Sequence, residues 1–165
     1  MLTKGDNFLN YIMALDQGTS SSRAIIYDAT GEVVTVAQTE IDLFFPADGW
    51  VEQDPQQLWQ SILTVGRQAI AQSGLAADAI KAIGITNQRE TAIIWNKRTG
   101  EPIGPAISWQ CRRTSTTCDQ LSERARTIRK KTGLPLDPYF SATKLQWLLN
   151  YYPETKHLIE TEDLC

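Results

Sequence analysis

A length of 165 residues is enough for one domain with a sizeable core, and no linker-like stretch predicts a boundary inside the chain. A net charge of -3 excludes a strong basic field for nucleic acid. The sequence contains no run of about 18 apolar residues, so it predicts no membrane span. Its N-terminal apolar stretch is broken by Asn10 and ended by Asp16, so it does not predict a signal peptide. A small-molecule ligand or a protein partner is the expectation.

The cysteines and the histidine carry no pattern of metal ligands. Cys111, Cys118 and Cys165 include no CxxC pair, and His157 has no partner at metal-ligand spacing. We expect reduced thiols in a cytoplasmic chain, with Cys111 and Cys118 in packing rather than redox roles.

Three strand-like runs open the chain, at residues 11–15, 23–27 and 33–39. The loop "DATGE" joins the last two, and its Gly31 suits a hairpin that needs a positive φ. The runs predict an antiparallel meander. A helix follows, with Asp54 as N-cap, Pro55 as first residue and Gly74 as its end. Its apolar face consists of Leu58, Ile62, Val65 and Ala69.

The second half predicts further strands and helices. The run at 80–86 is too apolar for a one-sided surface strand and predicts a buried, central strand. Residues 91–95 and 106–109 predict two more strands. Apolar spacing from Cys118 to Ile128 predicts a helix that ends at Gly133, and Ser141 can cap a third helix that Pro153 ends. The last twelve residues carry no signal, and the order predicts a mixed α/β fold.

The turn "LDQGTSSSR" concentrates hydrogen-bonding groups between two of these strands. It is either an ordinary polar turn or a phosphate site, in which backbone N–H groups around Gly18 and the hydroxyls of residues 19–22 would bind phosphate oxygens. Asp16 then fits a magnesium ion that it holds through a bound water. The pattern is not a P-loop, because no G-x-x-x-x-G-K-[ST] occurs in the chain.

The same turn, in the first hairpin of a β-β-β-α-β order, resembles the first phosphate loop of the actin-like ATPase and sugar-kinase superfamily. That resemblance implies a ribonuclease H-like α/β domain, with a mixed sheet that starts with the meander and has helices packed on it. Four segments are similar to glycerol kinases of the FGGY carbohydrate kinase family: "ALDQGTSSSRAI", "GWVEQDP", "GITNQRETAIIW" and "SWQCRRT". "DPYFSATKLQWLL" follows them, so the resemblance runs from Tyr11 to about Leu149.

The motif "NQRE" follows the apolar strand, at the kind of strand end where ligand sites concentrate. Arg89 offers donors and Glu90 offers acceptors for vicinal hydroxyls, although as isolated residues they also suit a solvated surface pair. Adjacent strand residues face opposite sides, so binding one ligand requires a bend at this pair. Arg112 and Arg113 suit packing or ion pairs.

The resemblance implies two sets of site residues. For glycerol it implies Arg89, Glu90, Trp109 and Tyr139, with Trp109 as an apolar wall and Tyr139 as a hydroxyl. For the phosphates of ATP or ADP it implies Thr19, Ser20, Ser21 and Arg23.

The resemblance also implies what these residues do not supply. In that family the catalytic Asp, the second phosphate motif and the adenosine motif come later in a longer, two-domain chain. Residues 1–165 therefore correspond to an N-terminal part of the first domain, and we expect little or no kinase activity from them alone. Asp137, followed by Pro138, is expected in a loop and not as the base. An unpaired sheet edge would favour self-association as a homo-oligomer.

Two other functions remain open at the level of sequence. One is a kinase for a different polyol or sugar, such as a pentulose. The other is a non-catalytic actin-like nucleotide-binding module, which would have no use for polar and aromatic residues around a polyol.

Overall fold

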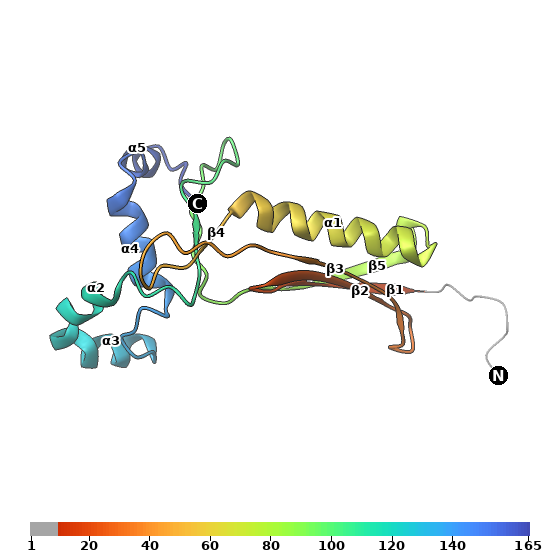
Figure 1. Cartoon of the computed structure of the whole chain (residues 1–165), viewed down its shortest axis with the longest axis horizontal. Helices are drawn as coiled ribbons and strands as arrows, with labels where there is room; N and C mark the ends of the chain where they lie inside the picture. Colours follow the sequence, from red (N-terminus) through yellow and green to blue (C-terminus); the bar gives the residue numbers. More distant parts are fainter. Residues whose placement is uncertain (1–9) are drawn as a thin grey trace. The chain divides into compact units, whose positions relative to one another are not determined.

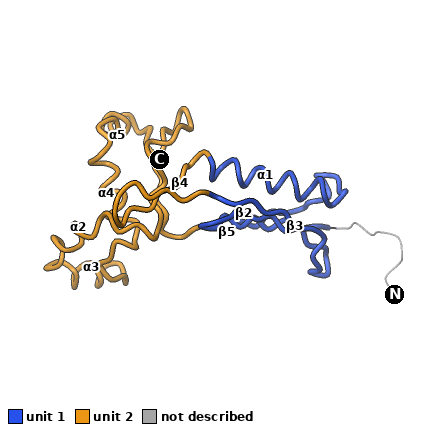
Figure 2. The backbone as a smooth tube through the Cα atoms, viewed as in Figure 1, with its two compact units in different colours: residues 1–41, 57–87 blue, residues 42–56, 88–165 orange. Residues whose placement is uncertain are grey.

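The computed structural model describes residues 10–165, which form two compact units (Figure 2). Unit 1 holds residues 10–41 and 57–87, and unit 2 holds residues 42–56 and 88–165. The sequence predicted no boundary within the chain, because the passages between the units contain no Gly/Ser-rich or Pro-rich linker. The stretch at residues 1–9, part of the segment in which the sequence predicts no signal peptide, lies outside the described residues.

Unit 1 contains the predicted meander. Strands β1 (Tyr11–Gln17), β2 (Ser21–Tyr27) and β3 (Val33–Glu40) pair antiparallel, and β5 (Ile80–Thr86) pairs parallel with β1, giving the order β3-β2-β1-β5 (Figure 1). In the β2–β3 turn Gly31 has φ +87°, as predicted. The Asp28 carboxylate accepts hydrogen bonds from Thr30 and from the Glu32 N–H, and those from Thr30 chiefly hold its pKa below the ordinary value.

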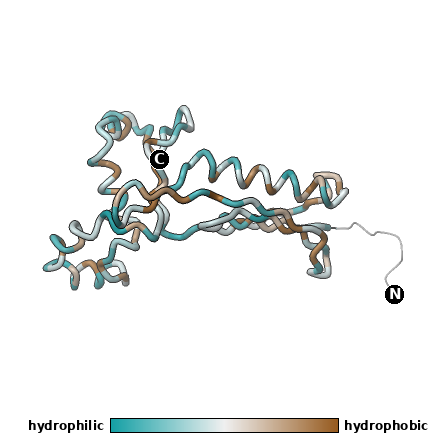
Figure 3. The backbone as a smooth tube through the Cα atoms, viewed as in Figure 1, coloured by the Kyte–Doolittle hydropathy of each residue, from teal (hydrophilic) through white to brown (hydrophobic). Residues whose placement is uncertain are grey.

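Helix α1 (Pro55–Ser73) covers one face of this sheet (Figure 1). It begins as predicted, because Asp54 Oδ1 accepts the Gln56 N–H at 2.8 Å. Hydrophobic and polar residues alternate along it (Figure 3), and its buried side meets the core formed by alternate residues of β1 and β2. The buried residues of this core are Tyr11, Met13, Leu15, Ala24, Ile26, Ala37, Val65 and Ala69.

The prediction that residues 80–86 form a buried, central strand is wrong. Strand β5 lies at an edge of the four-stranded sheet, and no described strand pairs with its outer side. Ile83 and Ile85 face the same side as the buried Met13 and Leu15 yet are 58% and 74% exposed, because no described helix covers them. An apolar run predicts that a strand is buried, but it does not predict which residues would pack against it. The unpaired edge that the sequence led us to expect is present, and self-association stays a prediction.

Unit 2 is built from short elements. They are β4 (Glu52–Gln53), β6 (Ala106–Ile107), α2 (Ser115–Gln120), α3 (Ala125–Thr132), α4 (Ser141–Tyr151) and α5 (Thr155–Glu160). Two 3-10 turns complete the chain, Ala77–Ala79 in unit 1 and Ser122–Arg124 in unit 2. Helix α5 was not predicted. No helix of residues 10–165 is long and apolar enough to cross a membrane.

Two predictions for unit 2 hold only in part. Residues 91–95 form no strand but only isolated bridges, from Ala92 to Ile107 and from Trp95 to Pro102. The predicted helix from Cys118 to Ile128 is broken into α2, a 3-10 turn and α3, although it does end at Gly133, with φ +76°. Only helix spacing was visible in the sequence, and the break at Leu121 carries no Gly or Pro signal.

The core of unit 2 gathers these short elements around apolar residues from across the unit. Its buried members are Val51, Ala92, Ile94, Ile103, Ile107, Cys111 and Leu148. Cys118 is also buried, so Cys111 and Cys118 pack as predicted. No group of three or more His, Cys, Asp or Glu in the described part of the chain could hold a metal ion.

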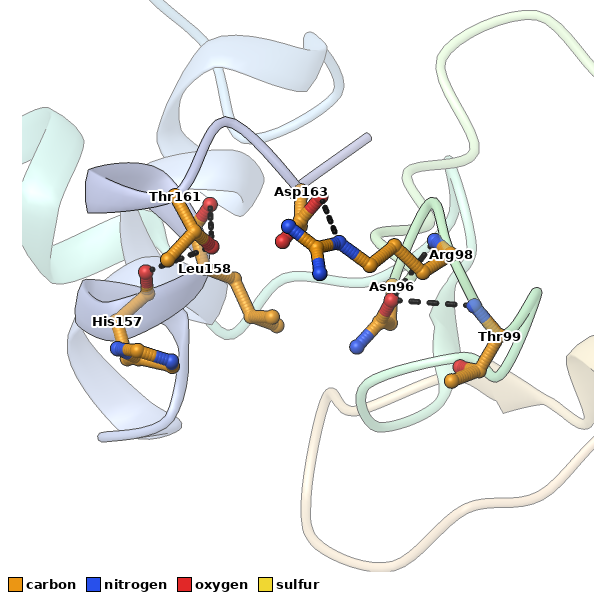
Figure 4. Close-up of polar contacts among 7 residues, drawn as sticks. All are labelled: Asn96, Arg98, Thr99, His157, Leu158, Thr161 and Asp163. Carbon is orange, nitrogen blue, oxygen red and sulfur yellow. Dashed lines mark hydrogen bonds and ion pairs between the residues drawn. The ribbon is translucent and has the colours of Figure 1, made fainter.

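The C-terminal residues join this unit by pairing with the turn after residue 95. The backbone N–H and C=O of Cys165 bond those of Trp95, at 2.9 and 2.8 Å. In Figure 4 the Arg98 side chain reaches Asp163 at 2.8 Å, while Asn96 Oδ1 caps the turn. The hydrogen bond from Arg98 lowers the pKa of the Asp163 carboxyl below its ordinary value. The last residues are therefore part of the fold of unit 2.

Arg113 forms a buried cation site inside unit 2. Its guanidinium lies 3.9 Å from the ring centroid of Trp50 and 4.6 Å from that of Trp147, and it donates to Glu52 Oε1 at 2.6 Å. The Arg113 side chain is fully buried, whereas its neighbour Arg112 is half-exposed and pairs with Asp137. Both arginines take the packing and ion-pair roles expected from the sequence.

Candidate functional site

The loop between β1 and β2 in unit 1 is the predicted phosphate loop. It is closed by a hydrogen bond from the Gly18 N–H to the Ser21 carbonyl at 2.9 Å. The Ser20 carbonyl accepts the Ile41 N–H at 2.9 Å, which ties the loop to the end of β3. Ser20 is exposed, whereas Thr19 and Ser21 are half-buried. The loop is therefore a fixed turn that exposes Ser20 to solvent.

Two donors that the sequence assigned to phosphate are used inside unit 1. The Gly18 N–H bonds Ser21, as described, and the Ser22 hydroxyl is buried at 2.7 Å from the hydroxyl of Ser61 on α1. In β2 alternate side chains face opposite sides, so Ser22 lies on the helix side while Ser21 and Arg23 lie on the other. Ser22 is thus a core residue of unit 1, and the prediction that its hydroxyl binds phosphate is wrong.

Asp16 and Arg23 are cross-strand partners on the sheet face away from α1. Asp16 is exposed, and Arg23 donates from Nε to Gln38 Oε1 at 3.0 Å. Thr86 pairs with Asp16 from the β5 side. A carboxylate, a guanidinium and a hydroxyl residue therefore lie in neighbouring register positions next to the loop.

The close approach of Gly18 and Ser21 makes a testable prediction. A Cβ at position 18 would lie 2.9 Å from the Ser21 carbonyl oxygen, so Gly18→Ala should destabilise unit 1 by about 1–3 kcal/mol. The matched control is Gly84→Ala in β5, where a Cβ meets nothing within 4 Å. Native-state hydrogen exchange of the β1 and β2 amides measures both. Equal protection in the two variants would show that the loop can relax without cost.

The predicted polyol residues lie in unit 2, beginning with the turn at Arg89 and Glu90. Glu90 has φ +65°, a left-handed conformation that is uncommon for a residue other than glycine. The bend that the sequence required at this pair is therefore present. Arg89 is exposed, and its side chain makes no hydrogen bond or ion pair with other residues of the described chain.

The Glu90 carboxylate caps helix α4. Its Oε2 accepts both the Ser141 N–H and the Ser141 hydroxyl, each at 2.8 Å. An acidic group at this position also complements the positive end of the helix dipole. The prediction that Ser141 itself caps the helix is wrong in detail: Ser141 is the first helical residue, and its hydroxyl donates to Glu90 instead.

Trp109 and Tyr139 meet beside this turn. Their ring centroids are 5.9 Å apart at an interplanar angle of 67°, an edge-to-face contact. The backbone N–H of Trp109 donates to Thr91 Oγ1 at 3.3 Å, so the main chain of Trp109 is tied to the segment that carries Glu90. Both aromatic residues are half-buried, so neither is enclosed in the core of unit 2.

Lys144 completes the cluster and was missed by sequence reasoning. It is buried on α4, and its Nζ donates to the backbone carbonyls of Glu90 and Tyr139 at 2.6 and 2.5 Å. Its position four residues before the buried Leu148 was an available signal, because a lysine on the apolar stripe of a helix needs buried acceptors. Glu90, Trp109 and Tyr139 are therefore brought together, and Arg89 joins them as the neighbour of Glu90.

Asp137 lies in the loop before Tyr139, as predicted. Its Oδ1 accepts the Tyr139 N–H at 2.8 Å and pairs with Arg112 Nη1 at 3.0 Å. These contacts give Asp137 a structural role in holding the loop.

Residues 11–162 match the N-terminal domain of the FGGY family of carbohydrate kinases. A glycerol kinase from Acidovorax sp. (strain JS42) is 49% identical over 159 residues, which are 95% of this chain and 32% of that relative. The chain thus spans about a third of the length of the curated relatives it matches.

Solved structures agree with the sequence comparison. The crystal structure of Plasmodium falciparum glycerol kinase with ADP is similar, with a TM-score of 0.88 and 33% identity. The match covers 94% of this chain and 32% of the Plasmodium falciparum chain. Ligand-bound xylulose kinase from Lactobacillus acidophilus has a TM-score of 0.77 and 25% identity, over 86% of this chain and 29% of that one. These similarities confirm the predicted mixed α/β fold of the ribonuclease H-like, actin-like ATPase type. The chain belongs to the FGGY family of carbohydrate kinases.

Proposed function

We propose that this chain supplies the first phosphate loop and most of the polyol site for phosphorylation of glycerol by ATP, which yields glycerol 3-phosphate. The observation that carries the proposal is the cluster of Glu90, Trp109 and Tyr139 in unit 2, tied together by Thr91, Ser141 and Lys144. The 49% identity to a glycerol kinase over 95% of the chain supports the choice of glycerol.

In the proposed site the side chains bind the polyol and do not carry out the transfer. Both hydrogen bonds from Ser141 end on Glu90 Oε2, so Oε1 can accept a glycerol hydroxyl. Arg89 donates to the neighbouring hydroxyl, Trp109 packs against the carbon chain, and Tyr139 adds a hydroxyl. The base for the reacting hydroxyl is expected from a downstream Asp outside residues 1–165, in the remainder of a two-domain kinase.

The loop in unit 1 fits the phosphates of ATP or ADP, a proposal that the ADP complex of the Plasmodium falciparum kinase supports. Thr19, Ser20, Ser21 and Arg23 would donate to phosphate oxygens. An exposed carboxylate beside the loop fits Mg²⁺, which typically uses one or two carboxylates together with substrate phosphates, so Asp16 would hold it through water. When bound, the ion neutralises charge on the phosphates. We place this activity in the cytoplasm, in keeping with cysteines that form no disulfide in the described residues.

Isothermal titration of glycerol against the chain tests the polyol site. Glu90→Gln keeps the shape and an acceptor for Ser141 but removes the charge, so we expect glycerol affinity to fall about 10- to 100-fold. Glu101→Gln, an exposed glutamate of the same unit, is the matched control and should bind as the unaltered chain does. Equal affinity in both variants would place the polyol elsewhere.

A kinase for another polyol or sugar is the second candidate, favoured by the similarity to a xylulose kinase structure. Tighter binding of xylulose than of glycerol in the same titration would select it. A chain that binds ADP but neither glycerol nor xylulose would instead support a non-catalytic actin-like module.

A further inference from the structure

Lys144 is the most deeply buried charged side chain next to the polyol cluster. It is 0% exposed, and its Nζ reaches two backbone carbonyls, at 2.6 Å from Glu90 O and 2.5 Å from Tyr139 O. These carbonyls belong to two of the residues proposed to contact glycerol. Lys144 itself is not proposed to touch the ligand.

Burial of this ammonium is costly, which argues against a simple packing role. Desolvation lowers the pKa of Lys144 to about 8, while the nearby carboxylate of Glu90 opposes that shift. A leucine or methionine would fill the space beside Leu148 without this cost. The charge is therefore explained by what it holds, namely the two carbonyl groups.

The carbonyl of Glu90 needs to be held because its backbone is strained. Glu90 has φ +65°, and such conformations persist only where surrounding contacts fix them. Lys144 fixes the main chain of Glu90, and Ser141 fixes its carboxylate. Both residues lie in the first four positions of α4, so one rigid element sets both ends of Glu90.

We propose that Lys144 is a positioning residue for polyol binding, which clamps the Glu90 turn and the Tyr139 loop to the start of α4. The inference rests on the proposed function for its ligand but not for its geometry. Without the clamp, Glu90 can leave its left-handed conformation, and its carboxylate is no longer held in the orientation that binds the polyol.

The test uses Lys144→Met, which keeps the length of the stem and removes the ammonium. Lys131→Met, an exposed lysine of α3, is the matched control. We expect Lys144→Met to bind glycerol at least about 10-fold more weakly, and the control to bind as before. The carbonyl ¹³C shifts of Glu90 and Tyr139 should move in Lys144→Met only. A folded Lys144→Met with unchanged glycerol affinity would overturn the proposal.

A double variant separates positioning from general destabilisation. If Lys144 acts through Glu90, then Lys144→Met combined with Glu90→Gln should lose little more affinity than the more damaging single change. Fully additive losses would mean that Lys144 acts independently of Glu90, and would overturn the proposal.

Two further measurements keep the proposal testable if binding or folding fails. If the unaltered chain binds no glycerol, the proposed function fails, and the carbonyl shifts in Lys144→Met alone decide whether the clamp exists. If Lys144→Met does not fold, the unaltered chain is titrated from pH 6 to 10. The titratable groups that act on Lys144 are Glu90, Cys111 and Asp137. The Glu90 and Tyr139 carbonyl shifts should follow the titration of Lys144, whose pKa desolvation lowers to about 8. Shifts that stay constant while the Lys144 ammonium loses its proton would contradict the clamp.

Discussion

Replacing Arg113 by alanine should lower the free energy of unfolding of unit 2 by about 3–5 kcal/mol. The change leaves the Glu52 carboxylate, which is 17% exposed, without the guanidinium that now lies 2.6 Å from it. It also removes the cation that lies 3.9 Å from the ring centroid of Trp50 and 4.6 Å from that of Trp147. Loss of a buried partner and loss of packing act in the same direction.

The neighbouring residue provides the control. Arg112 pairs with Asp137 at 3.0 Å, but the two side chains are 55% and 40% exposed. Arg112→Ala should therefore cost no more than about 1 kcal/mol. Native-state hydrogen exchange of core amides such as those of Ile107 and Leu148 measures both variants. Similar losses for the two arginines would show that burial of Arg113 is not what makes its pair matter.

The second large effect concerns turnover. The 165-residue chain alone should phosphorylate glycerol at least about 1,000-fold more slowly than a complete glycerol kinase. It spans about a third of the length of its relatives, and we have assigned no residue in it to the base or to the adenosine pocket. Without a positioned base and a complete nucleotide site, bound glycerol is phosphorylated little faster than in the uncatalysed reaction.

An ATP-coupled assay of glycerol 3-phosphate formation measures this turnover. A full-length glycerol kinase at equal concentration serves as the reference, and a preparation of the Gly18→Ala variant excludes a contaminating kinase. Turnover that approaches the reference and is lost in Gly18→Ala would show that these residues contain a complete active site.

Local sequence signals predicted unit 1 well and unit 2 poorly, for a physical reason. The meander and α1 depend on alternation, a positive-φ glycine at Gly31 and a cap at Asp54, all of which are encoded within a few residues. In unit 2 the short strands and the C-terminal pairing depend on contacts between distant segments, such as Trp95 with Cys165. Strand β5 has the same dependence on distant contacts: its apolar sequence predicted burial, but no described helix covers Ile83 and Ile85.

The candidate site divides in the same way. Glu90, Trp109 and Tyr139 were identified by resemblance and by residue chemistry, and the bend at Glu90 was required by strand geometry before the structure placed it. The place of Lys144 on an apolar helix stripe signalled buried acceptors. That Ser141 and Lys144 both hold Glu90 could not be predicted, because they lie more than fifty positions after it. Ser22 had the right chemistry for a phosphate site, but the alternation of β2 turns it into the core.

Titration of glycerol into ¹⁵N-labelled chain, followed by amide chemical shifts, tests most directly whether these residues form a polyol site. The expected result is a saturable shift of the amides of Arg89, Glu90, Trp109 and Tyr139 in unit 2, with the amides of α1 unchanged. Xylulose at the same concentrations should cause smaller shifts. No saturable change at these four residues, or the same change with both ligands, would contradict a glycerol site in this chain.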